Sequence, residues 1–447
     1  MGAYLNSTAA YTLYKGESEE PYFVDKTQML EDLFPLIKKG NSHICLTRPR
    51  RFGKTVMANM AASFFSKGCE SDDIFKNLRI AQSEDYEKYR NQFSVIHITW
   101  NDTPSSCFSY QQYIKRILEK LARDLKREYP MVKFDEGGDI VDLFMEIYIE
   151  DPRACLKNAF CQMCVTICGR FDPNEGGVVG YVDRMRVKYT AKWGVQLAGM
   201  NFQTRSSARF IFILDEWDYI FYQDYAAEQD KKAYLQLLRS LLKDKPYVLL
   251  TYMTGILPIA KYTSGSELNM FSEFTMAKTP MFSSCFGFTE QEVNELHKRY
   301  LNMCRNPSIG MDDLKNWYDG YHAADGERIY NPRSVVLALR CNHLENYWTS
   351  SGPYDEIFYY IAHNVNDVCG DIALMVSGQD VHARLQEYAA TSMDLQTKDE
   401  IFSAMVVYGF LSYENGRVSI PNRELMEILK EILKEEKKKA KKYKSKL

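Results

Sequence analysis

The 447-residue sequence contains no run of about 18 uninterrupted apolar residues, the length that a membrane-spanning helix requires. Its first segment, Met1 to Tyr14, has neither the basic stretch nor the apolar core of a secretory signal, so we expect no such signal. The formal net charge of −3 gives no large excess of either sign. The chain therefore shows no overall preference for nucleic acid or anionic membranes, and only a local basic patch remains open to such partners.

Disulfides are not expected either. The eleven cysteines are an odd number scattered through a long chain, which favours reduced thiols and a cytoplasmic location. Cys161, Cys164 and Cys168 lie close to Cys155 and follow helical spacing. One straight helix does not close a tetrahedral metal shell with its own side chains. We interpret the group as a buried helix face, with a metal site or a redox sensor as the alternatives.

Apolar runs alternate with helical patterns through the first two thirds of the chain. Strand-like runs occupy 44–47, 94–100, 209–214 and 247–253, and helical patterns occupy 54–65, 110–128, 141–168 and 231–242. The Gly- and Arg-rich segment 172–207 has no clear periodicity. Strands that read as continuous apolar runs between helices are typical of a parallel sheet covered on both faces. The sequence therefore predicts an α/β fold, and its length favours two or three domains.

The pattern changes around Phe286. Thr289 and Glu292 have the spacing of a capping box, and a mostly helical region with aromatic-rich turns follows. Segments 410–413 and 418–420 predict a hairpin with Asn-Gly at its turn. The lysine run at 437–446 is interpreted as a solvated helix tail, with a phosphate-contacting tail as the alternative.

The segment RPRRFGKT at 48–55 follows the first strand pattern and carries the second half of a Walker A loop. A glycine lets the backbone approach phosphates, the lysine reaches the β- and γ-phosphates, and the threonine hydroxyl binds Mg²⁺. The first glycine of the pattern is replaced by Arg48, and a basic turn before a helix is the alternative interpretation. Because the segment joins a strand to a helix, we predict nucleotide binding by Arg50, Arg51, Phe52, Gly53, Lys54 and Thr55, with Lys54 also serving catalysis.

The strand pattern at 209–214 ends in Asp215 and Glu216, as a Walker B strand does. Asp215 is predicted to hold Mg²⁺ together with Thr55, and Glu216 to orient and deprotonate the attacking water. A solvated turn is the alternative for the acidic pair. The next strand pattern ends at Thr254, which in the role called sensor 1 contacts the γ-phosphate or the water. A simple turn at Thr254 and Gly255 is the alternative there.

Seven short segments stand out in a fixed order: YFVDKT at 22–27, TRPRRFGKT at 47–55, LDEWD at 214–218, TGIL at 254–257, FGFT at 286–289, WYDGY at 317–321 and YNP at 330–332. Together they resemble the bacterial AAA-ATPase-like family, whose members often carry a C-terminal PD-(D/E)XK nuclease domain. The match extends through IPNRE at 420–424 and so covers most of the chain. Arginine at position 48 looks normal for that family, whereas Trp217 and Arg333 stand where it tends to have Tyr and Trp.

The resemblance implies an AAA-type P-loop core over 1–285, a helical lid over 286–392, a small winged-helix-like unit over 393–430 and a lysine-rich tail over 431–447. No Pro-Asp plus (Asp/Glu)-x-Lys pair can be built after Glu424, so we expect no nuclease activity from these residues. Either a partner protein supplies the nuclease activity, or this lineage has lost it.

The function predicted from these patterns is Mg²⁺-dependent ATP binding and hydrolysis coupled to lid movement. The alternative is a nucleotide-gated protein-interaction module with negligible turnover. A nucleic-acid-handling motor in defence or mobile-element biology is a third hypothesis. The expected partners are ATP and either another protein or a second copy of the chain, with nucleic acid as an open alternative and no membrane.

Overall fold

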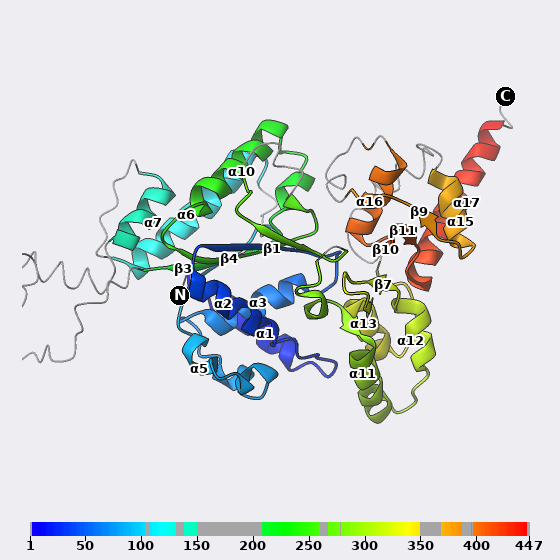
Figure 1. Cartoon of the computed structure of the whole chain (residues 1–447), viewed down its shortest axis with the longest axis horizontal. Helices are drawn as coiled ribbons and strands as arrows, with labels where there is room; N and C mark the ends of the chain where they lie inside the picture. Colours follow the sequence, from blue (N-terminus) through cyan, green and yellow to red (C-terminus); the bar gives the residue numbers. More distant parts are fainter. Residues whose placement is uncertain are drawn as a thin grey trace, which may run out of the picture.

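A computed structural model of the chain describes residues 2–102, 107–130, 138–149, 208–259, 267–277, 279–348, 368–386, 395 and 397–444. Within these ranges a parallel sheet covered by helices lies on the left of Figure 1. A second region, which combines helices with two small antiparallel sheets, lies on the right.

The central sheet has five parallel strands in the order β2-β3-β4-β1-β5. The strands are β1 (Ser42–Thr47), β2 (Ser94–Thr99), β3 (Phe210–Asp215), β4 (Val248–Gly255) and β5 (Ser272–Thr275). β1 and β3 are buried along their whole length, as strands covered on both faces must be. The predicted parallel sheet is confirmed. The short β5 was not predicted, because its sequence SEFT contains no apolar run.

Helices cover both faces of this sheet (Figure 1). On one face lie α1 (Ala9–Ser18), α2 (Met29–Lys39), α3 (Lys54–Phe65), α4 (Asp72–Phe75) and α5 (Tyr86–Tyr89), with the 3₁₀ turn η1 (Arg79–Gln82). On the other lie α6 (Tyr110–Glu128), α7 (Ile140–Ile149) and α10 (Glu228–Leu242). Alternate residues of a strand point to opposite faces. Accordingly Ile211 and Ile213 pack with α3, whereas Phe212 and Leu214 join the core formed with α6 and α10.

The predicted helices at 54–65 and 110–128 match α3 and α6, and α10 begins three residues before the predicted 231. Of the helical pattern predicted over 141–168, α7 accounts for the beginning. The rest of that pattern, its cysteines and the segment 172–207 lie outside the described residues.

The second region begins with a small antiparallel sheet and three helices. Its elements are β6 (Phe288–Thr289), α11 (Glu290–Met303), α12 (Met311–Tyr318), β7 (Tyr321–His322), β8 (Arg328–Tyr330) and α13 (Pro332–Cys341), preceded by the 3₁₀ turn η4 (Ser283–Cys285). The capping box is present, since Thr289 accepts from the Glu292 N–H and Glu292 accepts from the Thr289 N–H. The predicted aromatic turns are partly strands: Tyr330 pairs with Phe288, and Tyr321 with Ile329. Strands of two or three residues are too short to show an alternating pattern.

The last elements are α15 (Val368–Val376), β9 (Val381–His382), α16 (Lys398–Tyr408), β10 (Ser412–Glu414), β11 (Arg417–Ser419) and α17 (Arg423–Lys444). The predicted hairpin is β10–β11, and Asn415 and Gly416 at its turn both have positive φ, as a type I′ turn requires. α17 runs without a break through residue 430, so the segments 393–430 and 431–447 share one helix.

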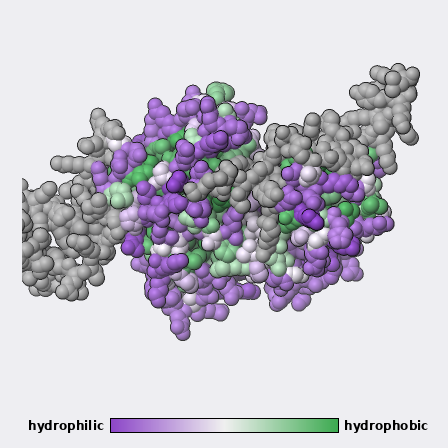
Figure 2. All heavy atoms as spheres, turned by 45° about the horizontal axis from the view of Figure 1, so that its top comes forward, coloured by the Kyte–Doolittle hydropathy of each residue, from purple (hydrophilic) through white to green (hydrophobic). Residues whose placement is uncertain are grey.

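Among the described residues, each helix is either too short or too polar to span a lipid bilayer. The described part of the face in Figure 2 is mostly hydrophilic, and its hydrophobic residues lie in scattered areas. The exposed large apolar side chains are spread along the described residues, among them Leu13 in α1, Met303 in α11 and Leu374 in α15. Single exposed apolar residues of this kind are ordinary on a folded protein.

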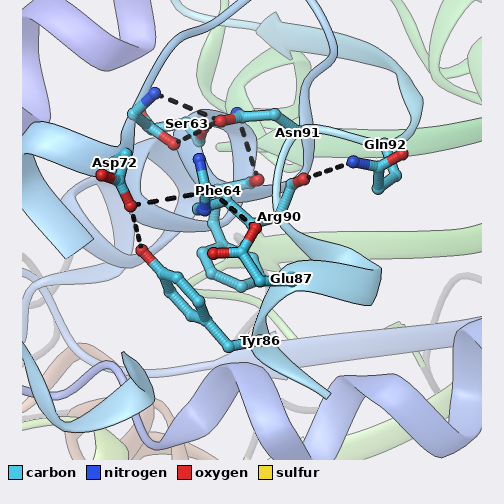
Figure 3. Close-up of polar contacts among 9 residues, drawn as sticks. Ser63, Phe64, Asp72, Tyr86, Glu87, Arg90, Asn91 and Gln92 are labelled. Atoms are coloured by element: carbon cyan, nitrogen blue, oxygen red, sulfur yellow. Dashed lines mark hydrogen bonds and ion pairs between the residues drawn. The ribbon is translucent and has the colours of Figure 1, made fainter. Parts of the chain in front are cut away.

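Asn91 joins the end of α3 to the start of β2 (Figure 3). Its Nδ2 donates to the carbonyl oxygens of Ser63, Phe64 and Ser66, at 3.1, 3.3 and 2.9 Å. Its Oδ1 accepts from the N–H and hydroxyl of Ser71. Its φ of 56° lies in the left-handed region, which asparagine tolerates better than most residues. One amide therefore satisfies backbone groups left over where α3 ends.

We predict that Asn91→Ala lowers the free energy of unfolding by about 2 kcal/mol, because buried carbonyl groups lose their donor and alanine is strained at this φ. Denaturant unfolding followed by circular dichroism measures the change. The matched control is the exposed neighbour Gln92, whose side chain donates only to the Arg90 carbonyl. Gln92→Ala should change stability by less than about 0.5 kcal/mol. Equal effects of the two substitutions would contradict the assigned role of Asn91.

Candidate functional site

The loop at residues 48–53 joins β1 to α3 and has two residues in the left-handed region, Arg51 with φ of 70° and Gly53 with φ of 86°. A Cβ placed on Gly53 meets no atom within 4 Å, so the backbone conformation, not lack of space, favours glycine there. The first N–H groups of α3 follow directly, and such groups have no acceptor within their own helix. The loop therefore presents a helix N-terminus, a common place for anions to bind.

Lys54, the first residue of α3, is buried at the end of this loop. Its Nζ donates to the carbonyl oxygens of Arg48 and Pro49, each at 2.9 Å. Burial lowers the pKa of Lys54 to about 8, and the carboxylates of Asp218, Glu216 and Asp215 oppose that shift. The positive charge of the buried ammonium group is thus stabilised by the loop carbonyls and the nearby carboxylates.

Arg48 occupies the place where a Walker A loop has its first glycine, and its guanidinium is buried within the structure. Nη1 donates to the carbonyl oxygens of Thr47 and Phe274 at 2.8 and 2.7 Å, and Nη2 donates to that of Phe282 at 3.1 Å. The guanidinium also lies 4.8 Å from the ring centroid of Phe286. These contacts tie the loop to the end of β5 and to Phe282.

The acidic pair lies at the carboxyl end of β3. Asp215 is fully buried, its Oδ1 accepts a hydrogen bond from the Thr254 hydroxyl on β4, and its Oδ2 has no hydrogen-bond partner among the described residues. Glu216 has a left-handed backbone with φ of 54°, a strained conformation for a residue other than glycine. Burial, followed by the charge of Asp215, raises the pKa of Glu216, while Lys54 opposes the rise.

Asp218 is a further site residue, for which the sequence alone predicts no role. It is buried, and its Oδ2 accepts from the backbone N–H groups of Ile256 and Leu257 at 3.0 and 2.9 Å. Burial raises its pKa, whereas these hydrogen bonds and the charge of Lys54 lower it. Among the charges that raise the pKa of Lys54, Asp218 has the largest effect. The signals in the sequence were its place three residues after Asp215 and its inclusion in the LDEWD segment at 214–218.

The site opens into a cavity of about 770 Å³, within the size range of pockets for small ligands. One wall is formed by the loop and the acidic turn, through residues 50–55, Glu216 and Asp218. Segments from the N-terminal part and from α13 form the other walls, and they include Tyr14, Tyr22, Phe23, Arg333, Val336 and Arg340. The cavity therefore lies between the parallel-sheet region and α13.

Several arginines line this cavity. Arg50 from the loop and Arg333 from α13 have no hydrogen-bond or ion-pair partner in the described part of the chain. Arg340 pairs with Glu20, and Arg51 donates to the backbone carbonyl of Tyr347. Cations without a partner at a helix N-terminus make the cavity suited to a ligand with several negative charges.

The structure thus brings Lys54, Thr55 and Glu216 to one cavity, although the first two are far from the third along the chain. Asp215 and Thr254 are not among the residues that line the cavity; both are buried, and the Thr254 hydroxyl donates to Asp215. Phe52 is also buried, and its ring meets that of Tyr321 edge to face at 5.0 Å.

Comparisons of the sequence with known proteins give no established function. A family of unknown function (DUF6783) matches residues 156–212, most of which lie outside the described residues. The chain is 22% identical over 340 residues to an uncharacterized protein in the vnfD 5′ region of Azotobacter chroococcum mcd 1. That match covers 75% of this chain and 52% of the relative, so the chain spans about half the length of the relative it matches.

Two solved structures are similar at a low level. One is the Walker-type ATPase PABY2304 of Pyrococcus abyssi, with a TM-score of 0.41 and 10% identity over 91% of this chain and 94% of that one. The other is the ORC2 protein of Aeropyrum pernix, in ADPNP and ADP complexes, with a TM-score of 0.39 and 11% identity over 92% and 93% of the two chains. Scores this low support no conclusion about function, which must come from the site itself.

The turn after β3 packs against the end of β4, and this contact gives a test of the site's geometry. A Cβ on Gly255 would lie 2.5 Å from Trp217 Cδ1 and 2.8 Å from Asp218 Oδ1. We predict that Gly255→Ala lowers the free energy of unfolding by about 1–3 kcal/mol, because the buried turn must move. Thermal and denaturant unfolding measure the effect.

The control is Gly370→Ala in α15, where an added Cβ meets nothing within 4 Å. That change should leave stability equal or raise it by up to about 1 kcal/mol, since alanine favours helix. If Gly255→Ala proves as stable as the parent, the turn does not pack on β4 as described.

Proposed function

We propose that the chain binds ATP with Mg²⁺ in this cavity and hydrolyses it. The observation that carries the proposal is the convergence of Lys54, at the N-terminus of α3, with the carboxylates that end β3. The lysine lies at a helix N-terminus, and the acidic pair ends a parallel strand two places away in the sheet. In phosphoryl transfer these groups have complementary roles. The first binds phosphate, and the second binds the metal and activates water.

The phosphates are bound by the loop. Backbone N–H groups at the start of α3 point toward the ligand, and Lys54 moves its hydrogen bonds from loop carbonyls to phosphate oxygens, which are stronger acceptors. Arg50 lies in the same wall and adds a second positive charge. Phe52 takes part through its backbone, because its ring is buried against Tyr321.

The residues present fit a magnesium ion. Asp215 has an oxygen without a partner among the described residues, while its other oxygen is held by Thr254. Thr55 lines the cavity and supplies a hydroxyl. No group of three or more potential metal-ligating side chains occurs in the described part of the chain. This suits Mg²⁺, which uses one or two protein ligands and takes the rest from phosphate and water. The ion would neutralise charge on the phosphate oxygens.

Glu216 is the proposed general base. Burial raises the pKa of Glu216. Its backbone is left-handed, and Glu216 lines the cavity whereas Asp215 does not. A water molecule attacks the γ-phosphorus, its proton passes to the Glu216 carboxylate, and the bond to the β–γ bridging oxygen breaks to release ADP. Thr254 contributes by orienting Asp215, to which its hydroxyl donates.

The outer parts of the cavity support a moving lid. α13 carries Arg333 and Arg340 into the cavity wall opposite the loop, so a bound triphosphate would attract this helix. We extend the proposal to lid movement coupled to turnover, with the region of α16 and the β10–β11 hairpin as a winged-helix-like unit. A protein partner or a second copy of the chain would receive this movement.

Two substitutions separate binding from turnover. Lys54→Ala should abolish ATP binding by isothermal titration calorimetry, because it removes the buried cation. Glu216→Gln should bind ATP within about threefold of the parent and lower phosphate release by about 10²–10⁴-fold. Lys232→Ala, an exposed lysine on α10, is the matched control and should change neither quantity. Absence of adenine-nucleotide binding by the parent protein would refute the proposal, and parental turnover by Glu216→Gln would refute the assignment of the base.

The lowered pKa of Lys54 predicts how nucleotide affinity depends on pH. Since bound phosphate favours the protonated lysine, binding above pH 8 must take up a proton. The affinity for Mg²⁺-ADP should be nearly constant from pH 7 to 8 and then fall by up to about tenfold per pH unit. Calorimetry in buffers of different ionisation enthalpy measures both the affinity and the proton uptake. In Lys54→Arg, whose side chain stays protonated, the decline should disappear. An unchanged slope in that variant would assign the titration to another group.

A further inference from the structure

Arg51 connects the loop at 48–53 with the second region of the chain. Its side chain lines the cavity, and its Nη1 donates to the backbone carbonyl of Tyr347, which follows α13. Its own φ of 70° is unfavourable for a residue with a side chain, so contacts made by that side chain help to hold the loop. A change in the contacts of Arg51 would therefore affect both the loop at 48–53 and the segment that contains Tyr347.

The peptide that Arg51 contacts is held from its other side by Glu424. The N–H groups of Tyr347 and Trp348 each donate to Glu424 Oε1 at 2.8 Å. The Ser334 hydroxyl on α13 lies 2.9 and 3.0 Å from the two carboxylate oxygens. Glu424 itself is fully buried in the first turn of α17. One carboxylate thus joins α17, α13 and the segment that follows α13.

A fully buried carboxylate needs compensation for its charge. Burial raises the pKa of Glu424 to about 7, and the hydrogen bonds from Ser334, Tyr347 and Trp348 oppose this rise together with the positive charge of Arg51. Arg51 is therefore an electrostatic partner of Glu424 as well as a donor to the adjoining peptide. Glu424 is the second residue of α17, and that helix continues into the lysine-rich segment as far as Lys444.

We propose that Arg51 and Glu424 form a junction through which an anion in the cavity loosens the attachment of helix α17. This inference rests on the proposed function, because it takes the anion to be the phosphates of a nucleotide. Phosphate oxygens are stronger acceptors for a guanidinium than a peptide carbonyl is. When Arg51 turns to the phosphates, the Tyr347 carbonyl loses a donor and Glu424 loses part of its charge compensation. The N-terminal turn of α17 is then less firmly held.

Coupling between two sites is reciprocal, so weakening the junction must change the affinity for nucleotide. Glu424→Gln keeps the shape of the side chain but removes the charge that attracts Arg51. We expect this variant to bind the non-hydrolysable analogue Mg²⁺-AMPPNP about fivefold or more tightly than the parent, the lower end of ordinary coupling. A residue with a purely structural role would leave the affinity equal or lower it. Calorimetry on the full chain measures the affinity.

The matched control is Glu427→Gln, on the same helix, whose partly exposed carboxylate pairs with Arg423. Its affinity for Mg²⁺-AMPPNP should stay within about twofold of the parent. Ser334→Ala is a second control, because it removes a hydrogen bond to Glu424 and keeps the charge. It should also show no fivefold gain. Equal affinities for the parent and a folded Glu424→Gln variant would overturn the junction.

Hydrogen exchange gives a second measurement, which does not need the Glu424 variant to fold. In the parent protein, saturating Mg²⁺-AMPPNP should speed exchange at the amides of Tyr347, Trp348 and the first turns of α17 by about threefold or more. In Arg51→Ala these amides should exchange faster without ligand and show no further change at saturation. Binding by the parent with unchanged exchange there would overturn the junction and leave the proposed function standing. Absence of binding would refute the proposed function, and the junction with it.

Discussion

The site depends on keeping one positive charge inside the protein. Lys54 is buried at the start of α3. The N-terminus of a helix carries a partial positive charge, so the helix itself does not stabilise the ammonium group. Among the described residues, the loop carbonyls of Arg48 and Pro49 and the carboxylates of the acidic turn after β3 offset that charge. A parallel sheet supplies this arrangement because the carboxyl ends of its strands meet at one edge, and β4 alone separates β1 from β3. Burial lowers the pKa of the lysine, and the carboxylates oppose that shift. A ligand with several negative charges would add to this compensation, which is the physical basis of the proposed phosphate site.

Much of the first region could be predicted from the sequence. The strands were recognisable because buried parallel strands are continuous apolar runs, and α3 and α6 because their patterns are long. That Lys54 and the acidic turn lie near each other could also be predicted, since strand-loop-helix order determines which edge of the sheet each residue occupies. Other features depend on contacts between distant residues, which no local pattern records. Asp218 is one case, because its role comes from the N–H groups of Ile256 and Leu257. The strands around Tyr330 are another, because two or three residues show no period.

Arg48 shows how a departure from a motif can be explained once the backbone is known. A glycine is required only where the backbone has positive φ or a neighbour comes too close. Arg48 is not among the residues with positive φ, whereas Arg51 and Gly53 are. The loop therefore has no conformational need for glycine at its first position. A long cationic side chain there can reach the carbonyls of Phe274 and Phe282, so the loop is joined to the segment that leads from β5 into the second region.

The two loop arginines then have different physical roles, although they are three residues apart. The guanidinium of Arg48 is fixed in place because carbonyls and the Phe286 ring enclose it. Burial also lowers its pKa to about 10. The guanidinium of Arg51 lies at the cavity wall and contacts a peptide whose other side is held by Glu424. A fixed arginine can only support the loop, whereas one shared between the cavity and a neighbouring backbone can change its partner when a stronger acceptor arrives. Both arginines extend from the same short loop. Because Arg48 anchors that loop, a change of partner at Arg51 would act on the second region and would not simply move the loop.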